Sequence, residues 1–432
     1  MTSRTFHRYA VSDFNKTKLQ MLNWANQFNI CCFLDNHNYQ IAPHSYECLL
    51  AAGSTAHIEC NAGDAFNKLK TFSAENRDWI FGHFGYDLKS ETENVQSNNF
   101  DGIGFPDMFF FVPEIIIKLD EHSISIAAPD AKRVLTSIQN FDAERPLTSN
   151  PVYVRERFTR QDYIDTVEEI KKHILRGDCY ELNFCVEFYK EDAQIDPLSI
   201  YLRLADLSPN PFSVYYRLFD KYLLCASPER YLRKSGNKLV SQPVKGTSRR
   251  SLTDSKTDEE SKQQLQRSAK EQSENVMIVD LVRNDLSRVC EEGSVRVEEL
   301  FGVYDFPQVH QMISTITGQL RDDLHWVDAI KETFPMGSMT GAPKRKVIEL
   351  VERYERTKRG IFSGSVGYVT PETDFDFNVV IRSIMYNDAE NYLSCQVGSG
   401  ITFYCDPVKE YEECLLKLEA IKKVLIGKSA LT

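Results

Sequence analysis

The chain is organised around Ser268-Ala-Lys-Glu-Gln-Ser-Glu-Asn-Val-Met-Ile-Val-Asp-Leu-Val-Arg-Asn-Asp-Leu286, a stretch with helical periodicity. One stripe of this helix begins with carboxylates and continues with apolar side chains. The stripe consists of Glu271, Glu274, Ile278, Leu281 and Asp285. Valines occupy other faces, so we expect the helix to be buried nearly all round. Because buried carboxylates are costly unless a cation compensates them, the two glutamates point to a nearby cation.

A second acidic helix is predicted in Val408-Lys-Glu-Tyr-Glu-Glu-Cys-Leu-Leu-Lys417, where Glu410, Glu413 and Lys417 share one face. If the two acidic helices met, their oxygens would suit Mg2+, which takes few protein carboxylates and keeps waters. The alternative is that each helix carries ordinary surface charges in water. The pattern of either helix alone leaves both possibilities open.

Composition limits the class of protein. Among 432 residues, 42% are hydrophobic and 26% are charged, as in a soluble globular enzyme. The net charge of −11 argues against a nucleic-acid partner, which would need a basic face. The most apolar run, Met108 to Ile117, is interrupted by Pro113 and Glu114 and is too short to cross a membrane. Eleven cysteines without CxxC pairs indicate buried reduced thiols in a cytoplasmic protein.

Strand patterns dominate the chain and repeating βαβ units are absent, so the sequence predicts a large antiparallel α+β fold. The proline-bearing segment Asp142–Pro151 is the best candidate for a linker. We therefore expect an N-terminal β-rich subdomain over residues 1–145 and a catalytic domain over residues 152–432.

Three further elements could contact a ligand. Phe334–Lys344 is a glycine-bearing loop that leads into a predicted helix, where free backbone N–H groups favour an anion. Val397-Gly-Ser-Gly-Ile401 is expected to be a tight turn at a strand end. Arg382 stands inside the apolar run Asn378–Ser383, and such arginines often bind a carboxylate. Each is also compatible with a structural turn or a charge at a strand edge.

A lysine occupies an unusual place in Gln242-Pro-Val-Lys-Gly-Thr247, between the end of a strand and a glycine. To act as a nucleophile, Lys245 would need a lowered pKa, which a desolvated pocket or a nearby Mg2+ could supply. The alternative is a solvated surface charge.

Taken together, these elements resemble the chorismate-utilising enzymes, a family that includes anthranilate synthase, aminodeoxychorismate synthase, isochorismate synthase and salicylate synthase. Six motifs carry the resemblance in the order typical of the family, over about residues 155 to 425. They are Ser227-Pro-Glu-Arg, Pro243-Val-Lys-Gly-Thr, Glu274-Asn-Val-Met-Ile-Val-Asp-Leu-Val-Arg-Asn-Asp, Gly337-Ser-Met-Thr-Gly-Ala-Pro-Lys, Gly398-Ser-Gly and Glu410-Tyr-Glu-Glu. The resemblance implies large antiparallel sheets packed as a sandwich with flanking helices, as in anthranilate synthase component I.

The resemblance also implies roles for individual residues. Glu274 and Glu413 match ligands of Mg2+, and Glu271 and Glu410 would support the metal and its waters. The metal in turn would hold the ring carboxylate of chorismate. Glu229 matches the general acid that protonates the departing C4 hydroxyl, and His310 matches a catalytic-site histidine found across the family. The implied substrate-binding residues are Thr247, Thr340, Arg382, Gly398, Gly400 and Lys417.

Lys245 indicates the branch of the family, because aminodeoxychorismate synthases carry a lysine where anthranilate synthases carry a small residue. In that branch the lysine attacks C2 as the hydroxyl leaves C4, and ammonia then enters at C4 and expels it. The implied product is 4-amino-4-deoxychorismate, which leads to p-aminobenzoate and folate. Glu181 stands where water-adding relatives need a lysine, which disfavours that branch. Most amine-adding relatives have glutamine there, so Glu181 also departs from them.

The resemblance implies two ligands, chorismate and ammonia. Because the chain shows no Gly-x-Cys-x-Gly nucleophile elbow, we expect ammonia from a separate glutamine amidotransferase subunit. The nearest alternative function is that of anthranilate synthase component I, which would release pyruvate and an aromatic product. A remoter alternative is a catalytically silent chorismate-binding protein, against which the retained set Glu229, Lys245, Glu274 and Glu413 argues.

Overall fold

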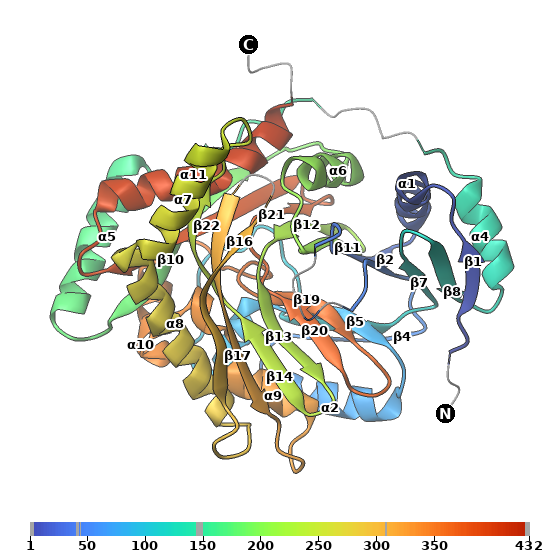
Figure 1. Ribbon diagram of the computed structural model, residues 1–432, viewed down its shortest axis with the longest axis horizontal. Helices are drawn as coiled ribbons and strands as arrows, with labels where there is room; N and C mark the ends of the chain where they lie inside the picture. The colour runs from blue at the N-terminus through green and yellow to red at the C-terminus, as the bar shows by residue number, and fades with distance from the viewer. Residues whose placement is uncertain (1–3, 40–42, 44, 144–149, 307–308, 428–432) are drawn as a thin grey trace.

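Two antiparallel sheets form the fold in the computed structural model, which describes residues 4–39, 43, 45–143, 150–306 and 309–427 (Figure 1). The first sheet has 12 strands and the second has 10. The first sheet runs β1 (His7–Ala10), β8 (Ser123–Ala127), β7 (Ile115–Leu119), β3 (Cys48–Ala52), β2 (Ile30–Asp35), β11 (Phe212–Leu218), β12 (Lys221–Ser227), β21 (Ser383–Asn387), β22 (Tyr392–Thr402), β10 (Glu181–Lys190) and β18 (Gly341–Ala342), with β9 (Arg155–Glu156) beside β10. The second runs β15 (Val244–Arg249), β17 (Val309–Gln319), β14 (Lys238–Gln242), β13 (Arg230–Ser235), β20 (Phe375–Asn378), β19 (Ser365–Val369), β5 (Ile80–Phe84), β6 (Met108–Val112) and β4 (Ala56–Cys60), with β16 (Arg296–Asp305) beside β17.

The sheets pack against each other, and alternation along β2 shows how. Cys32 belongs to the core shared with the second sheet, whereas its neighbours Cys31 and Phe33 belong to the core on the opposite face. Helices cover that opposite face of the first sheet. They are α1 (Phe14–Ala25), α4 (Ala131–Gln139), α5 (Arg160–Leu175), α6 (Pro197–Leu207), α10 (Lys344–Tyr354) and α11 (Pro407–Ile426). The predicted α+β sandwich with flanking helices is confirmed.

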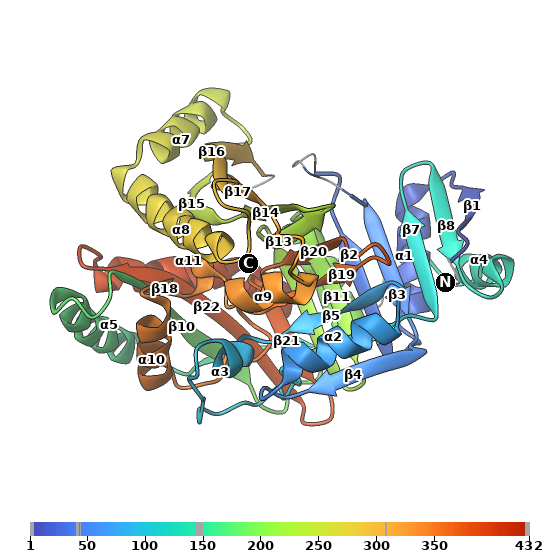
Figure 2. The same cartoon turned by 90° about the horizontal axis from the view of Figure 1, so that it is seen from below.

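Further helices pack around the second sheet and its edges. They are α2 (Ala65–Glu75), α3 (Lys89–Thr92), α7 (Ser255–Arg267), α8 (Ala269–Ser287) and α9 (Trp326–Thr333). Figure 2 shows α7 at the outer side of the molecule, beyond α8. The helix predicted from the opening stretch is confirmed as α8, with Ser268 as its N-cap. Its expected burial on nearly every face is wrong, because Val276 is 40% exposed and shares an exposed face with Ser273, Asp280 and Arg283.

Strands from the first third of the chain lie in both sheets. β2 pairs with β11, where Leu34 lies opposite Val214, and β5 pairs with β19, where Gly82 lies opposite Gly367. The division into an N-terminal subdomain of residues 1–145 and a catalytic domain of residues 152–432 therefore stays a prediction. Most of the predicted linker, residues 144–149, lies outside the described residues.

Two local predictions near the site are wrong, and both errors have a physical reason. Val397–Ile401 is no turn, because it continues strand β22, whose glycines allow close approach to β10. The run around Arg382 is not one strand. β20 ends at Asn378 in the second sheet, β21 begins at Ser383 in the first, and residues 379–382 between them cross from one sheet to the other.

Candidate active site

The candidate site lies where β15 of the second sheet approaches β10 and β22 of the first. Along the β10–β22 pair, Asn183 lies opposite Gly400 and Cys185 lies opposite Gly398. A Cβ atom on Gly400 would be 2.7 Å from Oε1 of Glu181 and 3.2 Å from Nζ of Lys245. Glycine is therefore required there, because any side chain would fill the space that the lysine and the glutamate occupy.

Lys245 and Glu181 form an ion pair in this space, with side chains that are 13% and 3% exposed. Nζ of Lys245 donates a hydrogen bond to Oε1 of Glu181 over 3.0 Å. Burial would lower the pKa of Lys245, but the carboxylates of Glu181 and Glu274 outweigh it and hold the pKa above its ordinary value. The lowered pKa that the sequence suggested for a nucleophile is therefore not what the surrounding carboxylates produce.

Glu229 supplies a group that can donate a proton. It lies between β12 and β13 and is 4% exposed. Burial raises the pKa of Glu229 to about 7, although the nearby Ser338 hydroxyl and the Lys245 ammonium oppose the increase. A carboxyl with such a pKa is substantially protonated at neutral pH and is suited to general acid catalysis.

The acidic faces of α8 and α11 meet through a lysine. Nζ of Lys270 lies 3.1 Å from Oε1 of Glu410 and 3.8 Å from Oε1 of Glu274. Burial raises the pKa of Glu274 to about 7 despite the opposing charge of Lys245, and burial likewise raises the pKa of Glu410. The compensating cation that the sequence pattern demanded is, in part, a side chain of the same helix.

The remaining two glutamates lie close to the strands of the site. Nζ of Lys417 lies 2.8 Å from Oε1 of Glu413 and donates to the carbonyl oxygen of Gly398 over 2.8 Å. Burial would raise the pKa of Glu413, but Lys417 and Lys270 outweigh it and lower that pKa. A Cβ atom on Gly246 would be 3.0 Å from Oε2 of Glu271, so Glu271 lies against the strand that carries Lys245.

The four glutamates fit a water-rich divalent cation site. Oε1 of Glu274 is buried without a hydrogen-bond partner, and the ammonium of Lys270 already stands as a cation between two of the carboxylates. As placed, no three of the four offer carboxylate oxygens that all lie within 4.8 Å of one another. Mg2+ does not need such a cage, because it binds through one or two carboxylates and retains several waters.

The predicted substrate-binding side chains differ in their surroundings. Arg382 has a left-handed backbone with φ of 50°, and burial lowers the pKa of its guanidinium to about 10 although Glu229 opposes this. The buried hydroxyl of Thr340 donates to the carbonyl oxygen of Met336 over 3.2 Å. Thr247 lies exposed on β15.

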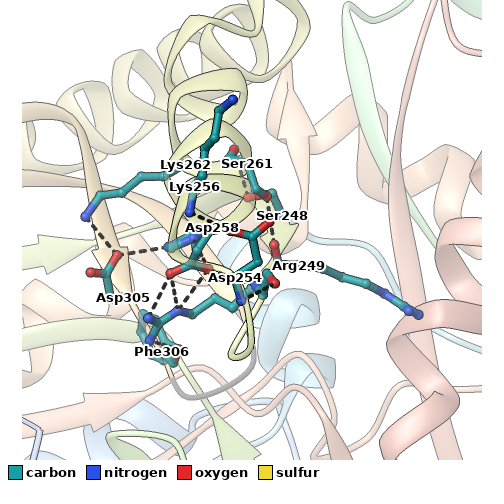
Figure 3. A network of polar contacts seen from close by, with 12 residues as sticks. Ser248, Arg249, Asp254, Lys256, Asp258, Ser261, Lys262, Asp305 and Phe306 are labelled. Carbon is teal, nitrogen blue, oxygen red and sulfur yellow. Dashed lines mark hydrogen bonds and ion pairs between the residues drawn. The ribbon is translucent and has the colours of Figure 1, made fainter.

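His310 lies in a polar network around α7. Its Nδ1 is 2.9 Å from Oδ1 of Asp305 and its Nε2 is 3.1 Å from Oδ1 of Asp258. Figure 3 shows Asp258 of α7 at the centre of this network and Lys262 reaching Asp305. The polar contacts of the His310 side chain therefore lead to α7 and β16, and none of them joins it to Lys245 or Glu229 among the described residues.

Sequence reasoning missed Lys270, Asp258 and Asp305. Lys270 had a usable signal, because it precedes Glu274 by four residues, the spacing at which helical side chains meet. The two aspartates had none, because they come from separate elements that only the sheet brings to His310.

Comparisons with known proteins identify the family of the chain. The sequence profile of the chorismate-binding enzyme family matches residues 30–423. The chain is 33% identical over 349 residues to aminodeoxychorismate synthase component 1 of Escherichia coli strain K12, covering 80% of this chain and 76% of that protein. It is 34% identical over 387 residues to a probable chloroplastic aminodeoxychorismate synthase of Oryza sativa subsp. japonica. This match covers 80% of the chain but only 43% of the rice protein, so the chain spans less than half of that relative.

The solved structure of anthranilate synthase component I from Streptococcus pneumoniae TIGR4 superposes with a TM-score of 0.77 at 24% identity, covering 89% of this chain and 94% of that one. At this identity the match supports the fold. None of the described helices combines the length and the apolar character that crossing a bilayer requires.

Proposed function

The chain belongs to the chorismate-binding enzyme family, and from this premise we propose that it is an aminodeoxychorismate synthase, converting chorismate and ammonia to 4-amino-4-deoxychorismate. The observation that carries the proposal is the position of Lys245. Its ammonium lies where the two sheets meet, and its positive charge lowers the pKa of Glu229, which opposes the effect of burial on that carboxyl. In this proposal Lys245 supplies the nucleophile and Glu229 supplies the acid, and both act on one bound chorismate.

In the proposed reaction, the Lys245 amine attacks C2 while Glu229 gives its proton to the C4 hydroxyl, which leaves as water. Ammonia then attacks C4, the double bonds shift back, and the lysine departs from C2. Burial supports the acid role of Glu229, because a carboxyl with a pKa of about 7 is still protonated in a large fraction of the protein molecules at neutral pH.

We assign Mg2+ binding to Glu274 and Glu413, with Glu271 and Glu410 holding its waters. When bound, the ion would supply positive charge for the ring carboxylate of chorismate. Glu274 supports the assignment because one of its oxygens is buried without a hydrogen-bond partner.

We assign the enolpyruvyl carboxylate and its surroundings to Arg382, Thr340 and the amides of Gly398 and Gly400, with Thr247 and Lys417 at the edge of the pocket. The guanidinium of Arg382 supports this because its surroundings disfavour its positive charge, which a carboxylate would compensate. His310 is assigned to the same site, where its contacts to Asp258 and Asp305 would fix the orientation of the ring.

The proposed partner is a glutamine amidotransferase subunit that delivers ammonia, with free ammonium as a substitute. A cytoplasmic location is proposed with it, since all eleven cysteines are buried and unpaired.

Product identity tests the function. Purified protein is incubated with chorismate, ammonium and Mg2+, and products are separated and weighed by mass spectrometry. The proposal expects a product that keeps the enolpyruvyl group and has the C4 hydroxyl replaced by an amine. Release of pyruvate with formation of anthranilate would instead identify anthranilate synthase component I, and no turnover would indicate a silent chorismate-binding protein.

A further inference from the structure

Glu181 differs from Glu187 and Glu355, two other buried carboxylates of the fold. It is 2% exposed, its Oε1 accepts one hydrogen bond from Lys245, and its Oε2 is buried without a hydrogen-bond partner. Glu187, farther along the same strand, contacts Arg157, Tyr392 and Ser394. A buried carboxylate that serves only the fold is normally satisfied in that way, and Glu181 is not.

Glu355 makes the same contrast. Its Oε1 accepts from the backbone N–H of Cys185 over 2.8 Å and from Arg359 over 2.7 Å, and its Oε2 accepts from Arg359 over 3.0 Å. The carboxylate of Glu181 has Lys245 as its single hydrogen-bond donor, so nothing else in the described structure holds its negative charge. It retains lone pairs with which to accept a proton.

We propose that Glu181 is the catalytic base that takes the proton from Lys245 and so frees its amine to attack chorismate. This inference rests on the function proposed above and adds a residue to it. The geometry carries it, because Oε1 and Nζ are 3.0 Å apart, within reach for direct proton transfer. Gly400 keeps the contact open, since a Cβ there would be 2.7 Å from the same oxygen.

The step balances as follows. A proton moves from Nζ of Lys245 to Oε1 of Glu181, and the free electron pair of Nζ forms the bond to C2. The two ring double bonds shift, the C4–O bond breaks, and the hydroxyl leaves as water with the proton of Glu229. After ammonia bonds to C4, the C2–N bond breaks with its electrons returning to Nζ. Lys245 recovers its proton from Glu181, and Glu229 recovers one from the new C4 ammonium.

Proton transfer from Lys245 to Glu181 becomes favourable when bound substrate excludes water from the site. In the free protein the charged pair is favoured, because the carboxylates of Glu181 and Glu274 outweigh burial and raise the pKa of Lys245. Removing water favours the uncharged amine and acid, because two charges in a medium of low dielectric constant are costly. A substrate carboxylate placed nearer to Glu181 than to the ammonium of Lys245 would favour the uncharged acid further.

The test compares wild type with Glu181→Gln, a substitution that keeps shape and removes the base. Enzyme is mixed with chorismate without an amine donor, quenched, digested, and the adduct on the Lys245 peptide is followed in time. We expect adduct formation in the variant to be about 100-fold slower near pH 7. This is the lower end of the rate enhancement that a positioned proton acceptor usually gives. Above pH 7 the ratio of the wild-type rate to the variant rate should fall about tenfold per pH unit, because solvent then removes the lysine proton in the variant.

Two further variants separate chemistry from folding. Glu181→Asp keeps a carboxylate, so its adduct should form at least about tenfold faster than that of Glu181→Gln. Glu187→Gln removes another buried carboxylate of β10 that does not touch Lys245, and it should leave the pH dependence of the adduct rate unchanged.

Equal rates for wild type and Glu181→Gln, a faster variant, or a ratio independent of pH would overturn the inference. A faster variant would mean that Glu181 only holds Lys245 as an ammonium. Failure of the proposed function looks different, because the wild-type protein itself would then make no 4-amino-4-deoxychorismate from chorismate and ammonium. In that case the Glu181 proposal falls with it.

Discussion

The environment of Glu229 differs clearly from that of a solvated carboxyl. Burial moves its pKa from 4.5 to about 7. The unfolded chain therefore ionises this group at lower pH than the folded protein does, and folding loses stability between those two values. A shift of this size corresponds to about 3 kcal/mol at full ionisation.

We predict that Glu229→Gln removes this pH dependence. The stability of wild type relative to the variant should fall by about 3 kcal/mol from about pH 4 to about pH 8, with the change centred between the two pKa values. Urea denaturation at a series of pH values measures it. A constant difference across the series would show that Glu229 ionises normally.

In wild type, kcat should also fall as pH rises through about 7, because the acid loses its proton.

At the scale of single residues, the sequence identified most of the candidate site. Glu229, Lys245 and the four helical glutamates all lie where the two sheets meet α8 and α11. The sequence could not predict the raised pKa of Lys245, because that depends on three carboxylates from β10, α8 and α11. Their distances to Nζ are set by tertiary packing alone.

At the scale of elements, α8 and α11 are joined by Lys270 in the position where their carboxylates would hold a metal. A bound divalent cation and the ammonium would repel each other at such short distances. We therefore predict that Lys270→Met binds Mg2+ about tenfold more tightly than wild type, or about 1.4 kcal/mol.

Isothermal titration of the protein with Mg2+ alone measures this affinity. Lys256→Met is the matched control, since Lys256 is exposed on α7 and its nearest carboxylate, of Glu260, is 3.9 Å away. Its Mg2+ affinity should equal that of wild type. Weaker binding in Lys270→Met would mean that Lys270 positions Glu410 for the metal and does not compete with it.

Elements were predicted well where periodicity was strong and poorly where glycine or a sheet change intervened. The helical pattern of Ser268–Leu286 gave the extent of α8 to within one residue at each end. The glycines of β22 suggested a turn, because glycine is typical of turns, yet here they serve close contact with Glu181 and Cys185. The apolar run before Arg382 suggested one strand, because segments buried between sheets and buried strands have similar compositions.

At the scale of the whole molecule, the first third of the chain is built into both sheets. β2 and β5 lie at interior positions, each with neighbours from later parts of the chain on one side. We predict that a fragment of residues 152–432 does not fold by itself, because β11 and β19 would expose buried edges. Circular dichroism and size-exclusion chromatography of the fragment, alone and mixed with residues 1–145, measure this. A monomeric, cooperatively unfolding fragment would establish residues 152–432 as an independent domain.

The overall architecture was predictable, and its interleaving was not. Alternating strand patterns without βαβ units indicate antiparallel sheets. Which strands become neighbours depends on long-range pairing, such as β12 with β21, that no local pattern encodes.

The most direct test of the account is mass spectrometry of the Lys245 peptide after incubation of the protein with chorismate and Mg2+ but no amine donor. The account predicts a covalent adduct of the chorismate ring on Lys245. It also predicts that Lys245→Ala shows no adduct and loses most of its 4-amino-4-deoxychorismate synthesis while still binding chorismate. Absence of the adduct in wild type, together with full activity in Lys245→Ala, would contradict the account and indicate direct attack of ammonia on chorismate.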